Sequence, residues 1–478
     1  MLAALRKLSG AAPARVHDFM IRHPVPRKVE PALIRIYPCL AGSVFRRTRR
    51  LNATTQWWTR KQFEELQVEQ LRGILSHAYS ATSYYRQVMD EAGFRPQAFA
   101  SLADMAKVPM TSKEALRLHQ TEMTDRTADR GRLVAHESSG STSSGLRLYE
   151  SPEAWAFENA FFDRWYAWHG IRIGERTVVF SAAPGRRVLT YNPMGNIMYL
   201  NLAQVRVDAA AMVSLLRSFR PAVLRGYPSA IVQAAEYILR EGWSGSIPTL
   251  KRVFLASEQV FTSQVSLIRE AFGVPVSSHY GLSERVALIQ QCPSGSLFHI
   301  MPEYSYVEIL GEDGNPVTQG GEIGLIVGTS FCNRAVPLIR YQTADWAVVA
   351  DDQKCPDCGR SFKSVCRIEG RSGDFVRTPS GKVWSPTAIE WVNNVQRPTI
   401  RESQIWQTDV DQIVILIVPG EGFKDEDGQA YVDDLQAMIG EPGLKMSASV
   451  VDQIDRPKSQ KQRFVRSDIV ASPFDAPT

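Results

Sequence analysis

The chain has 478 residues, a net charge of +5 and 44% hydrophobic residues, a composition typical of globular proteins rather than of disordered or fibrous ones. One hydrophobic core seldom supports such a length, so we expect about two or three domains. No uninterrupted apolar run is long enough to span a bilayer, and the stretch from Met1 to Leu8 is too short and too charged for a secretory signal. Six cysteines in so long a chain do not indicate a disulfide scaffold, so we expect a reducing, cytoplasmic compartment.

A basic cluster, Arg46-Arg47-Thr-Arg49-Arg50, lies near the N-terminus. Such clusters are usually solvated faces; the alternative is a peripheral contact with an acidic lipid surface or a phosphorylated partner. The arginines lack interleaved aromatic residues, so we expect no nucleic-acid binding.

The N-terminal third is predicted to be mainly helical. Residues 60–92 carry apolar side chains at near-helical spacing, and Gly93 follows as a stop signal. Thr111-Ser-Lys-Glu114 resembles a capping box before another helix. A short strand is predicted at residues 132–136.

The loop after this strand, residues 137–145, reads Glu-Ser-Ser-Gly-Ser-Thr-Ser-Ser-Gly. Its glycines let the backbone curl so that N–H groups converge, and its hydroxyls add donors, which suits a polyphosphate. It is not a Walker A loop, because no Gly-Lys-Ser/Thr follows. A flexible surface loop is the alternative. The candidate phosphate ligands are Ser139, Gly140, Ser141, Thr142 and Ser143.

From about residue 151 to 310, helical stretches alternate with short apolar runs. Strands are predicted at residues 177–180, 253–256 and 272–276, and helices at residues 209–219 and 229–239. This alternation favours an α/β layered domain.

The last third changes character twice. Strand-like runs at residues 306–310, 324–328 and 346–350, separated by Gly, Pro and Asp, predict a β-rich subdomain. After Gly370-Arg371 the chain restarts with a β-forming run at 404–418, a helix at 425–439 and a strand at 447–454, which together predict a small separate domain.

Four further motifs follow the Ser/Gly loop. The first, His279-Tyr280-Gly281-Leu282-Ser283-Glu284, offers an aromatic ring for a base, a hydroxyl for a phosphate and a carboxylate for Mg²⁺. The others are Pro337-Leu-Ile-Arg-Tyr-Gln-Thr-Ala-Asp345, Gly370-Arg371-Ser-Gly373-Asp374 and the stretch from Asp455 to Arg463. Each by itself also fits a structural turn or a solvated charge run.

In this order and spacing the motifs resemble those of the adenylate-forming superfamily of acyl-CoA synthetases and adenylation domains. More closely, the chain is similar to the phenylacetate–CoA ligase branch and its CapK-like members, from about residue 60 to the C-terminus. The supporting phrases are Leu75-Ser-His-Ala-Tyr79, Tyr84-Tyr85-Arg86, Arg225-Gly-Tyr-Pro-Ser229 and Ala256-Ser-Glu258.

The resemblance implies a role for each matching residue in ATP binding or adenylation. The phosphate loop would hold the β- and γ-phosphates. Tyr280 would stack on adenine, beside Gly281 and Glu258 in the nucleotide site. The remaining matches are Ser283 near the α-phosphate, Glu284 on Mg²⁺, Asp345 on both ribose hydroxyls, Arg371 at the domain junction, and Lys461 as the lysine that bonds the carboxylate and α-phosphate.

The chain departs from the family pattern at three places. The phosphate loop ends Ser143-Ser144-Gly145 where relatives have Gly-x-Pro, so its tip is expected to differ in shape. The hinge position, usually Asp or Lys, is Gly373, which tolerates large backbone rotations. Gln460 replaces the glycine that usually precedes the catalytic lysine, which makes Lys458 a rival to Lys461.

The resemblance implies an α/β fold in which a large layered N-terminal domain with a β-rich subdomain carries a small α+β C-terminal domain on a hinge. The expected boundaries are an N-terminal extension packed on the core at residues 1–60, a large adenylation domain at 61–370 (β-rich at about 300–370) and a mobile domain at 371–478.

The implied reaction is ATP-dependent activation of a small-molecule carboxylic acid to an acyl-adenylate with release of pyrophosphate, followed by transfer to a thiol, that of CoA. The alternatives are transfer to an amine, in polysaccharide or natural-product biosynthesis, and a catalytically silent nucleotide-binding scaffold. The implied cofactors are ATP, Mg²⁺ and CoA.

A separate pattern predicts a structural zinc site. Cys355-Pro-Asp-Cys358 is a C-x-x-C knuckle, and Cys292 and His299 lie seven residues apart upstream. The family fold places these two stretches near each other. The alternatives are four ordinary residues around a tight turn, or Cys366 as a substitute ligand.

Overall fold

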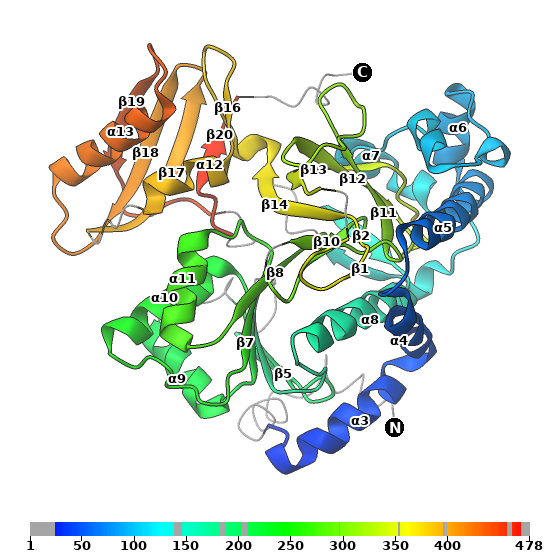
Figure 1. Ribbon diagram of the computed structural model, residues 1–478, viewed down its shortest axis with the longest axis horizontal. Helices are drawn as coiled ribbons and strands as arrows, with labels where there is room; N and C mark the ends of the chain where they lie inside the picture. The colour runs from blue at the N-terminus through cyan, green and yellow to red at the C-terminus, as the bar shows by residue number, and fades with distance from the viewer. Residues whose placement is uncertain are drawn as a thin grey trace.

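The computed structural model describes residues 24–137, 146–181, 188–201, 209–295, 297–351, 354–394, 397, 399–456 and 461–469. The predicted phosphate ligands Ser139, Gly140, Ser141, Thr142 and Ser143, and the rival lysine Lys458, lie outside these residues. Figure 1 shows a large part that holds the long sheet and the N-terminal helices, and a smaller C-terminal part in orange and red at its upper left.

Helices dominate the described chain up to Met123. They are α3 (Glu30–Leu40), α4 (Gly42–Thr55), α5 (Arg60–Ala81), α6 (Ser83–Glu91) and α7 (Lys113–Met123). Short 3-10 turns lie at Arg27–Val29, Pro96–Ala98, Leu102–Lys107, Arg130–Arg132 and Ser372–Asp374.

The helical segment predicted at residues 60–92 is two helices rather than one. Thr82 is extended between them (φ −120°, ψ 149°), and its hydroxyl accepts a hydrogen bond from Tyr85 N, so it begins α6 as an N-cap. The capping residue of α7 is Ser112, whose hydroxyl accepts from Ala115 N, one residue after the predicted Thr111.

A 12-stranded sheet runs through the large part, in the order β11-β12-β13-β14-β10-β9-β8-β7-β6-β3-β5-β4. Its first half along the chain comprises β3 (Thr177–Ser181), β4 (Leu189–Asn192), β5 (Ile197–Asn201), β6 (Val223–Gly226), β7 (Arg252–Leu255) and β8 (Val276–Gly281). All of these pair in parallel except the edge strand β4.

The other half of the sheet is antiparallel. Its strands are β9 (Leu288–Gln291), β10 (Phe298–Ile300), β11 (Ser305–Leu310), β12 (Ile323–Ser330), β13 (Tyr341–Val349) and β14 (Ser364–Arg371). The strands predicted as a β-rich subdomain therefore continue the same sheet as the parallel strands.

Strand β8 joins the two halves. Its first residues pair in parallel with β7, up to Ser278, and its last residues pair antiparallel with β9, from His279 onward. The strand predicted at residues 272–276 is wrong, because Phe272 ends the preceding helix and Gly273 closes it in the left-handed conformation (φ 68°). The His279–Glu284 motif consequently begins inside a strand, at the centre of the sheet.

Helices cover both faces of the parallel half. On one face α9 (Ala209–Phe219), α10 (Pro228–Arg240) and α11 (Thr262–Phe272) bury an aliphatic core against β3, β6 and β7. On the other face α8 (Pro152–Trp168) buries Phe161, Phe162 and Trp165 against Phe254. A two-stranded hairpin, β1 (Val134–Glu137) and β2 (Arg147–Glu150), flanks the Ser/Gly loop. These layers confirm the predicted α/β class.

The C-terminal part has its own sheet, in the order β19-β18-β17-β20. Its elements are β15 (Val376–Arg377), β16 (Val383–Trp384), α12 (Pro386–Asn394), β17 (Ile400–Asp409), β18 (Gln412–Pro419), α13 (Asp425–Ile439), β19 (Lys445–Val450) and β20 (Val465–Ser467). Figure 1 places this sheet above α10 and α11. Among the described residues, no helix combines the length and apolar character needed to cross a membrane.

Candidate active site

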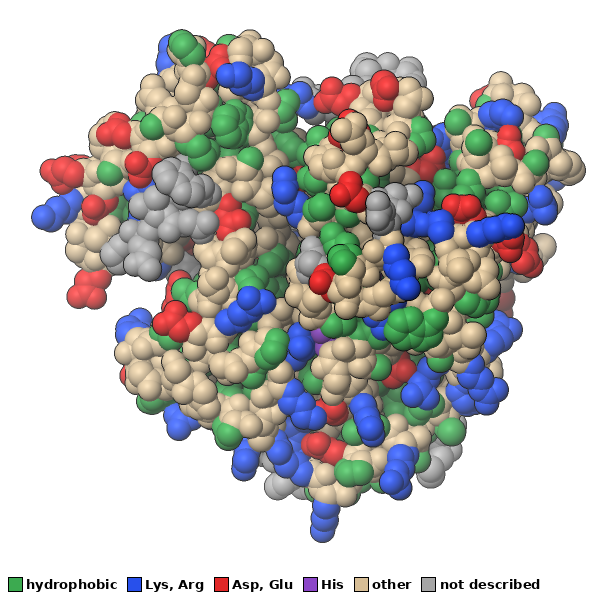
Figure 2. All heavy atoms as spheres, in the orientation of Figure 1, with side chains coloured by type: hydrophobic (Ala, Val, Ile, Leu, Met, Phe, Trp, Pro, Cys, Tyr) green, Lys and Arg blue, Asp and Glu red, His purple; other side chains and the backbone are tan. Residues whose placement is uncertain are grey.

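A cavity of about 1170 Å³ lies between the large part and the C-terminal part. Figure 2 shows the surface hollowed between these two parts. Eight of the predicted site residues line the cavity: Glu258, Tyr280, Gly281, Ser283, Glu284, Asp345, Arg371 and Lys461. Residues as far apart in the sequence as Glu258 and Lys461 thus meet around one space large enough for a nucleotide and a small acid.

Tyr280 and Asp345 form the buried centre of this site. The Tyr280 hydroxyl donates a hydrogen bond of 2.7 Å to Asp345 Oδ2, and Arg371 Nε lies 3.4 Å from Asp345 Oδ1. Strands β13 and β14 bring this about, because their register pairs Asp345 directly with Arg371. Burial raises the pKa of Asp345, an effect that Arg371 and the Tyr280 hydrogen bond oppose, and the neighbouring carboxylate raises the pKa of Arg371.

Ser283 and Glu284 form the turn after β8. The Tyr341 hydroxyl lies 3.4 Å from Glu284 Oε1, at the start of β13. The turn is anchored from behind by Arg285, which takes up a left-handed conformation (φ 54°) and pairs with Glu150 and Glu158. Both half-buried residues of the motif therefore face the cavity on a fixed support.

The hairpin that flanks the Ser/Gly loop lies against this turn. His136 Nε2, at the end of β1, is 3.2 Å from the Ser283 carbonyl oxygen. Glu150, at the end of β2, accepts a 3.0 Å hydrogen bond from Arg285 Nη2. Both strands of this hairpin thus contact the turn that carries Ser283 and Glu284.

Lys461 enters the cavity from the C-terminal part. Burial, followed by the nearby Arg371, lowers the pKa of Lys461 to about 8, although Glu258, Asp345 and Glu284 act in the opposite direction. A partly desolvated ammonium among these groups is suited to meeting an incoming anion.

Lys113 is a cavity residue that the sequence reasoning did not select. It stands at the first position of α7 and lines the cavity, and burial followed by Arg371 lowers its pKa. Backbone hydrogen bonds from Thr111 N to Arg340 O (3.0 Å) and from Gln342 N to Thr111 O (2.9 Å) fix the start of this helix beside β13. The capping-box phrase marked the helix start, but nothing in it indicated that the lysine faces the site.

Glu258 differs in position from the other predicted nucleotide ligands. Its two carboxylate oxygens accept hydrogen bonds from Ser229 N (3.0 Å), Ser229 Oγ (2.9 Å) and Gln462 N (2.7 Å). Its acceptor capacity is therefore used largely inside the protein.

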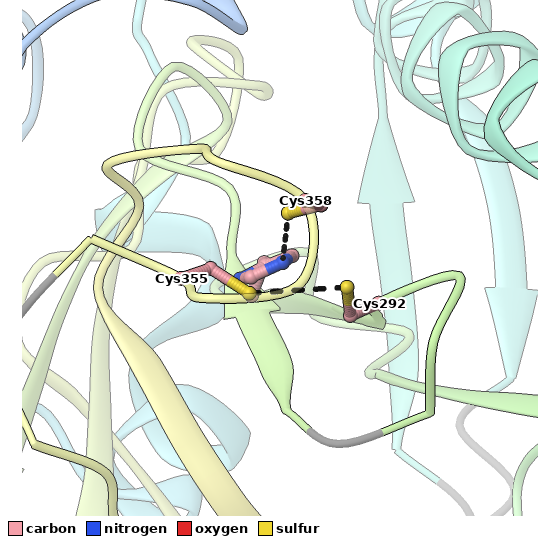
Figure 3. Close-up of side chains that lie close together, drawn as sticks. Cys292, Cys355 and Cys358 are labelled. Atoms are coloured by element: carbon pink, nitrogen blue, oxygen red, sulfur yellow. Dashed lines mark hydrogen bonds between the residues drawn. The ribbon is translucent and has the colours of Figure 1, made fainter.

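The predicted zinc ligands are brought together. Cys292, His299, Cys355 and Cys358 place their ligand atoms within 4.8 Å of one another. Figure 3 shows the sulfur atoms of Cys292, Cys355 and Cys358 gathered together, with Cys292 contributed by one chain segment and the two knuckle cysteines by another. The positive φ of Gly359 (70°) closes the knuckle turn immediately after Cys358.

The geometry of this group fits a tetrahedral ion. Cys292 Sγ and Cys355 Sγ are 3.9 Å apart, and Cys358 Sγ is 3.2 Å from His299 Nε2. Sulfur ligands at about 2.3 Å from a tetrahedral zinc would lie about 3.8 Å apart. His299 Nδ1 lies 2.9 Å from Ser364 Oγ, the kind of outer partner that orients a ligating imidazole. Cys366, the substitute ligand, lies outside the group and contacts the Val349 carbonyl oxygen.

The basic cluster on α4 is partly structural. Arg49 Nε pairs with Asp163 Oδ2 of α8 at 2.6 Å, and Arg46 donates to the Cys39 carbonyl oxygen. Arg47 and Arg50 are exposed. Figure 2 shows basic side chains gathered along the lower edge of this face, where α3 and α4 lie.

Comparison with known proteins identifies related chains. Residues 376–468 match the family model of the CapK C-terminal domain. A phenylacetate-coenzyme A ligase of Thermus thermophilus is 27% identical over 390 residues, which covers 78% of this chain and 85% of the relative.

Among solved structures, 2-hydroxyisobutyryl-CoA ligase in the postadenylation state has a TM-score of 0.72 at 20% identity, over 86% of this chain and 91% of that one. The same ligase in the thioesterification state reaches 0.57, with the same identity and coverage. The predicted resemblance to phenylacetate–CoA ligases and CapK proteins is thereby confirmed.

Proposed function

We propose that this homologue of phenylacetate–CoA ligases and CapK, with the fold of the adenylate-forming CoA ligases, is an AMP-forming ligase that activates a carboxylic acid and transfers the acyl group to the thiol of CoA. One observation carries the proposal. The cavity gathers, from segments far apart in the sequence, an anion for ribose, an aromatic ring for adenine and three cations for a polyphosphate and a carboxylate.

The first half-reaction joins two anions. A carboxylate oxygen attacks the α-phosphorus of ATP, the bond to the β-phosphate oxygen breaks, and pyrophosphate leaves. In the proposed arrangement Asp345 accepts hydrogen bonds from the ribose hydroxyls, and Tyr280 lies against adenine. Lys461, Arg371 and Lys113 then offset the negative charge that accumulates around the α-phosphorus.

The second half-reaction transfers the acyl group. The thiol sulfur attacks the carbonyl carbon of the mixed anhydride, the bond to the phosphate oxygen breaks, and AMP leaves. Lys461 has no part in this step, so the C-terminal part is free to move, with Gly373 as the proposed hinge.

Two metal ions complete the proposal. Glu284, on its fixed turn, would hold Mg²⁺, which offsets phosphate charge when bound. Cys292, His299, Cys355 and Cys358 would hold a structural Zn²⁺, which joins the β9–β10 connection to the knuckle before β14. Thiolate ligands and an ATP substrate both suit the cytoplasm, where we place the protein.

An amine acceptor is the second candidate. It is proposed from the resemblance to CapK-like proteins, whose C-terminal domain model matches residues 376–468. A nucleotide-binding scaffold without turnover would be the outcome if no acid is activated.

The test is ATP–pyrophosphate exchange with a panel of aryl, arylacetic, hydroxy and sugar acids. Acids that support exchange are then supplied with CoA or with amines, and the products are weighed by mass spectrometry. A thioester supports the proposal and an amide supports the second candidate. Silence across the panel, with ATP binding intact, would favour the scaffold.

A further inference from the structure

The turn between β7 and α11 contacts the C-terminal part at the loop that carries Lys461. Glu258 Oε1 accepts the Gln462 backbone N–H at 2.7 Å. The carboxylate is held in place by Ser229, near the start of α10, whose N–H and hydroxyl both donate to it. Because Gln462 directly follows Lys461, this one bond fixes where the lysine side chain begins.

An aromatic contact lies beside this bond. Phe261, from the same turn, packs edge-to-face on Phe464, with ring centroids 5.3 Å apart at 77°. Phe261 is 5% exposed and belongs to the hydrophobic cluster of the C-terminal part, with Val376 and Ile389. A side chain of the large part is therefore buried in the core of the mobile part, and any rotation away would uncover it.

The residue between these two contacts is also engaged. Arg463 Nε donates to Asp374 Oδ1 (2.8 Å), and Arg463 Nη2 donates to the Gly373 carbonyl oxygen (2.9 Å). Residues 462, 463 and 464 thus each have at least one partner outside their own loop, and Arg463 reaches the hinge position itself.

We propose that Glu258 is a positioning residue: with Phe261 it forms a docking platform that fixes the Lys461 loop for adenylation and releases it for acyl transfer. The family resemblance implies that Glu258 binds the nucleotide. Its three hydrogen-bond donors within the protein instead favour a role in holding the Lys461 loop. The effect of this docking on adenylation rests on the proposed function. The docking itself rests only on the contacts described above.

Hydrogen exchange tests the docking without any substrate. In the full-length protein the peptide containing Gln462 should exchange at least about tenfold faster in Glu258→Ala and Phe261→Ala than in wild type, because the amide loses its acceptor or its cover. Glu270→Ala, on the exposed face of the same α11, serves as the matched control and should leave exchange unchanged. Unchanged exchange in both platform variants would overturn the proposal.

The kinetics of the two half-reactions test how this docking affects catalysis. Glu258→Ala should lower the kcat of ATP–pyrophosphate exchange about 10- to 100-fold, with the KM for ATP within about twofold and with thiolysis of supplied acyl-adenylate not slowed. If Glu258→Ala raises the KM for ATP but does not speed hydrogen exchange at Gln462, Glu258 is a nucleotide ligand instead. Equal losses in both half-reactions, with a lower Tm, would make its role merely structural.

A backbone variant tests the single bond. Gln462→Pro removes the N–H that Glu258 accepts, whereas Gln462→Ala keeps it. The proline variant should match Glu258→Ala, the alanine variant should match wild type, and the Glu258→Ala/Gln462→Pro double variant should lose no more than either alone. Additive losses would show that Glu258 acts elsewhere. If the wild-type protein activates no acid, the proposed function fails. Hydrogen exchange then still tests whether Glu258 and Phe261 dock the Lys461 loop.

Discussion

The Tyr280 hydroxyl donates a 2.7 Å hydrogen bond to Asp345 Oδ2, joining the last residues of β8 to the middle of β13 across the sheet. If Asp345 also accepts the ribose hydroxyls, the tyrosine orients the carboxylate while its ring faces the base. Asp345→Asn should then raise the KM for ATP about 10- to 100-fold, because hydrogen bonds to a charged group are lost. Tyr280→Phe should raise it less than about tenfold, because the ring remains. Both values come from ATP–pyrophosphate exchange, and equal effects would contradict separate roles.

Lys461 should act in only one of the two half-reactions. Lys461→Ala is expected to lower the kcat of exchange about 100- to 1000-fold, since it removes the cation that meets the carboxylate and α-phosphate. Thiolysis of supplied acyl-adenylate should be spared. Lys458→Ala is the matched control, because it removes the rival lysine three residues earlier. A larger loss in the Lys458 variant would transfer the assignment, and equal loss of both half-reactions would count against Lys461.

The pKa of Lys461, lowered to about 8, predicts a pH dependence. The active form is the cation, which predominates below the pKa. The kcat/KM of exchange, which reports the free enzyme, should therefore fall about tenfold per pH unit above about pH 8. Bound ATP favours the cation, so the fall in kcat should come at higher pH. Thiolysis should instead rise over this range as more of the thiol ionises. A flat exchange profile up to pH 10 would exclude an essential ammonium with a lowered pKa.

Local patterns predicted those elements whose sequence and packing agree. Helix α13 begins and ends at the predicted residues 425 and 439, because its apolar face is regular and Gly440 closes it in the left-handed conformation. The strand predicted at residues 272–276 was misplaced because Phe272 and Val274 are as typical of a strand as of a buried helix end. Strand β14 was missed, since its residues do not alternate regularly between polar and apolar, and its place is set by pairing with β10 and β13.

The sequence predicted those site residues that belong to recognisable motifs. Tyr280, Asp345 and Arg371 stand where the motif order placed them, around one cavity. The contact between Glu258 and Gln462 joins segments 204 positions apart, and no local pattern encodes it. The same holds for Lys113, whose neighbourhood is set by the bridge between Thr111 and Tyr341.

Lys113 gives a prediction about the nucleotide. Its ammonium lines the cavity near Glu284 and Asp345, and burial lowers its pKa. Lys113→Ala should raise the KM for ATP about 10-fold, because a partly desolvated cation facing the polyphosphate is lost. Lys107→Ala, an exposed lysine paired with Asp104 on the preceding turn, is the control and should leave the KM unchanged. If Lys113→Ala changes only the KM for the acid, the lysine faces the other substrate.

The Cys/His group predicts that metal and stability will be lost together. Elemental analysis of the purified protein should give about one zinc per chain, and Cys355→Ser/Cys358→Ser should contain none. Because the ion would join the connection after β9 to the knuckle before β14, its loss should lower the Tm by several degrees or more.

Cys366→Ser is the matched control for the zinc site, because this thiol is on β14, the strand after the knuckle, and lies outside the group. It should keep both the metal and the Tm. A chelator that strips the wild-type protein should reproduce the Tm of the double variant, and should leave that variant itself unchanged. The exchange rate per folded molecule should fall far less than in Lys461→Ala, since none of the four ligands faces the reacting atoms in the proposed mechanism. Wild-type protein without zinc, or a double variant that keeps it, would leave these residues as a buried thiol cluster with no metal to hold.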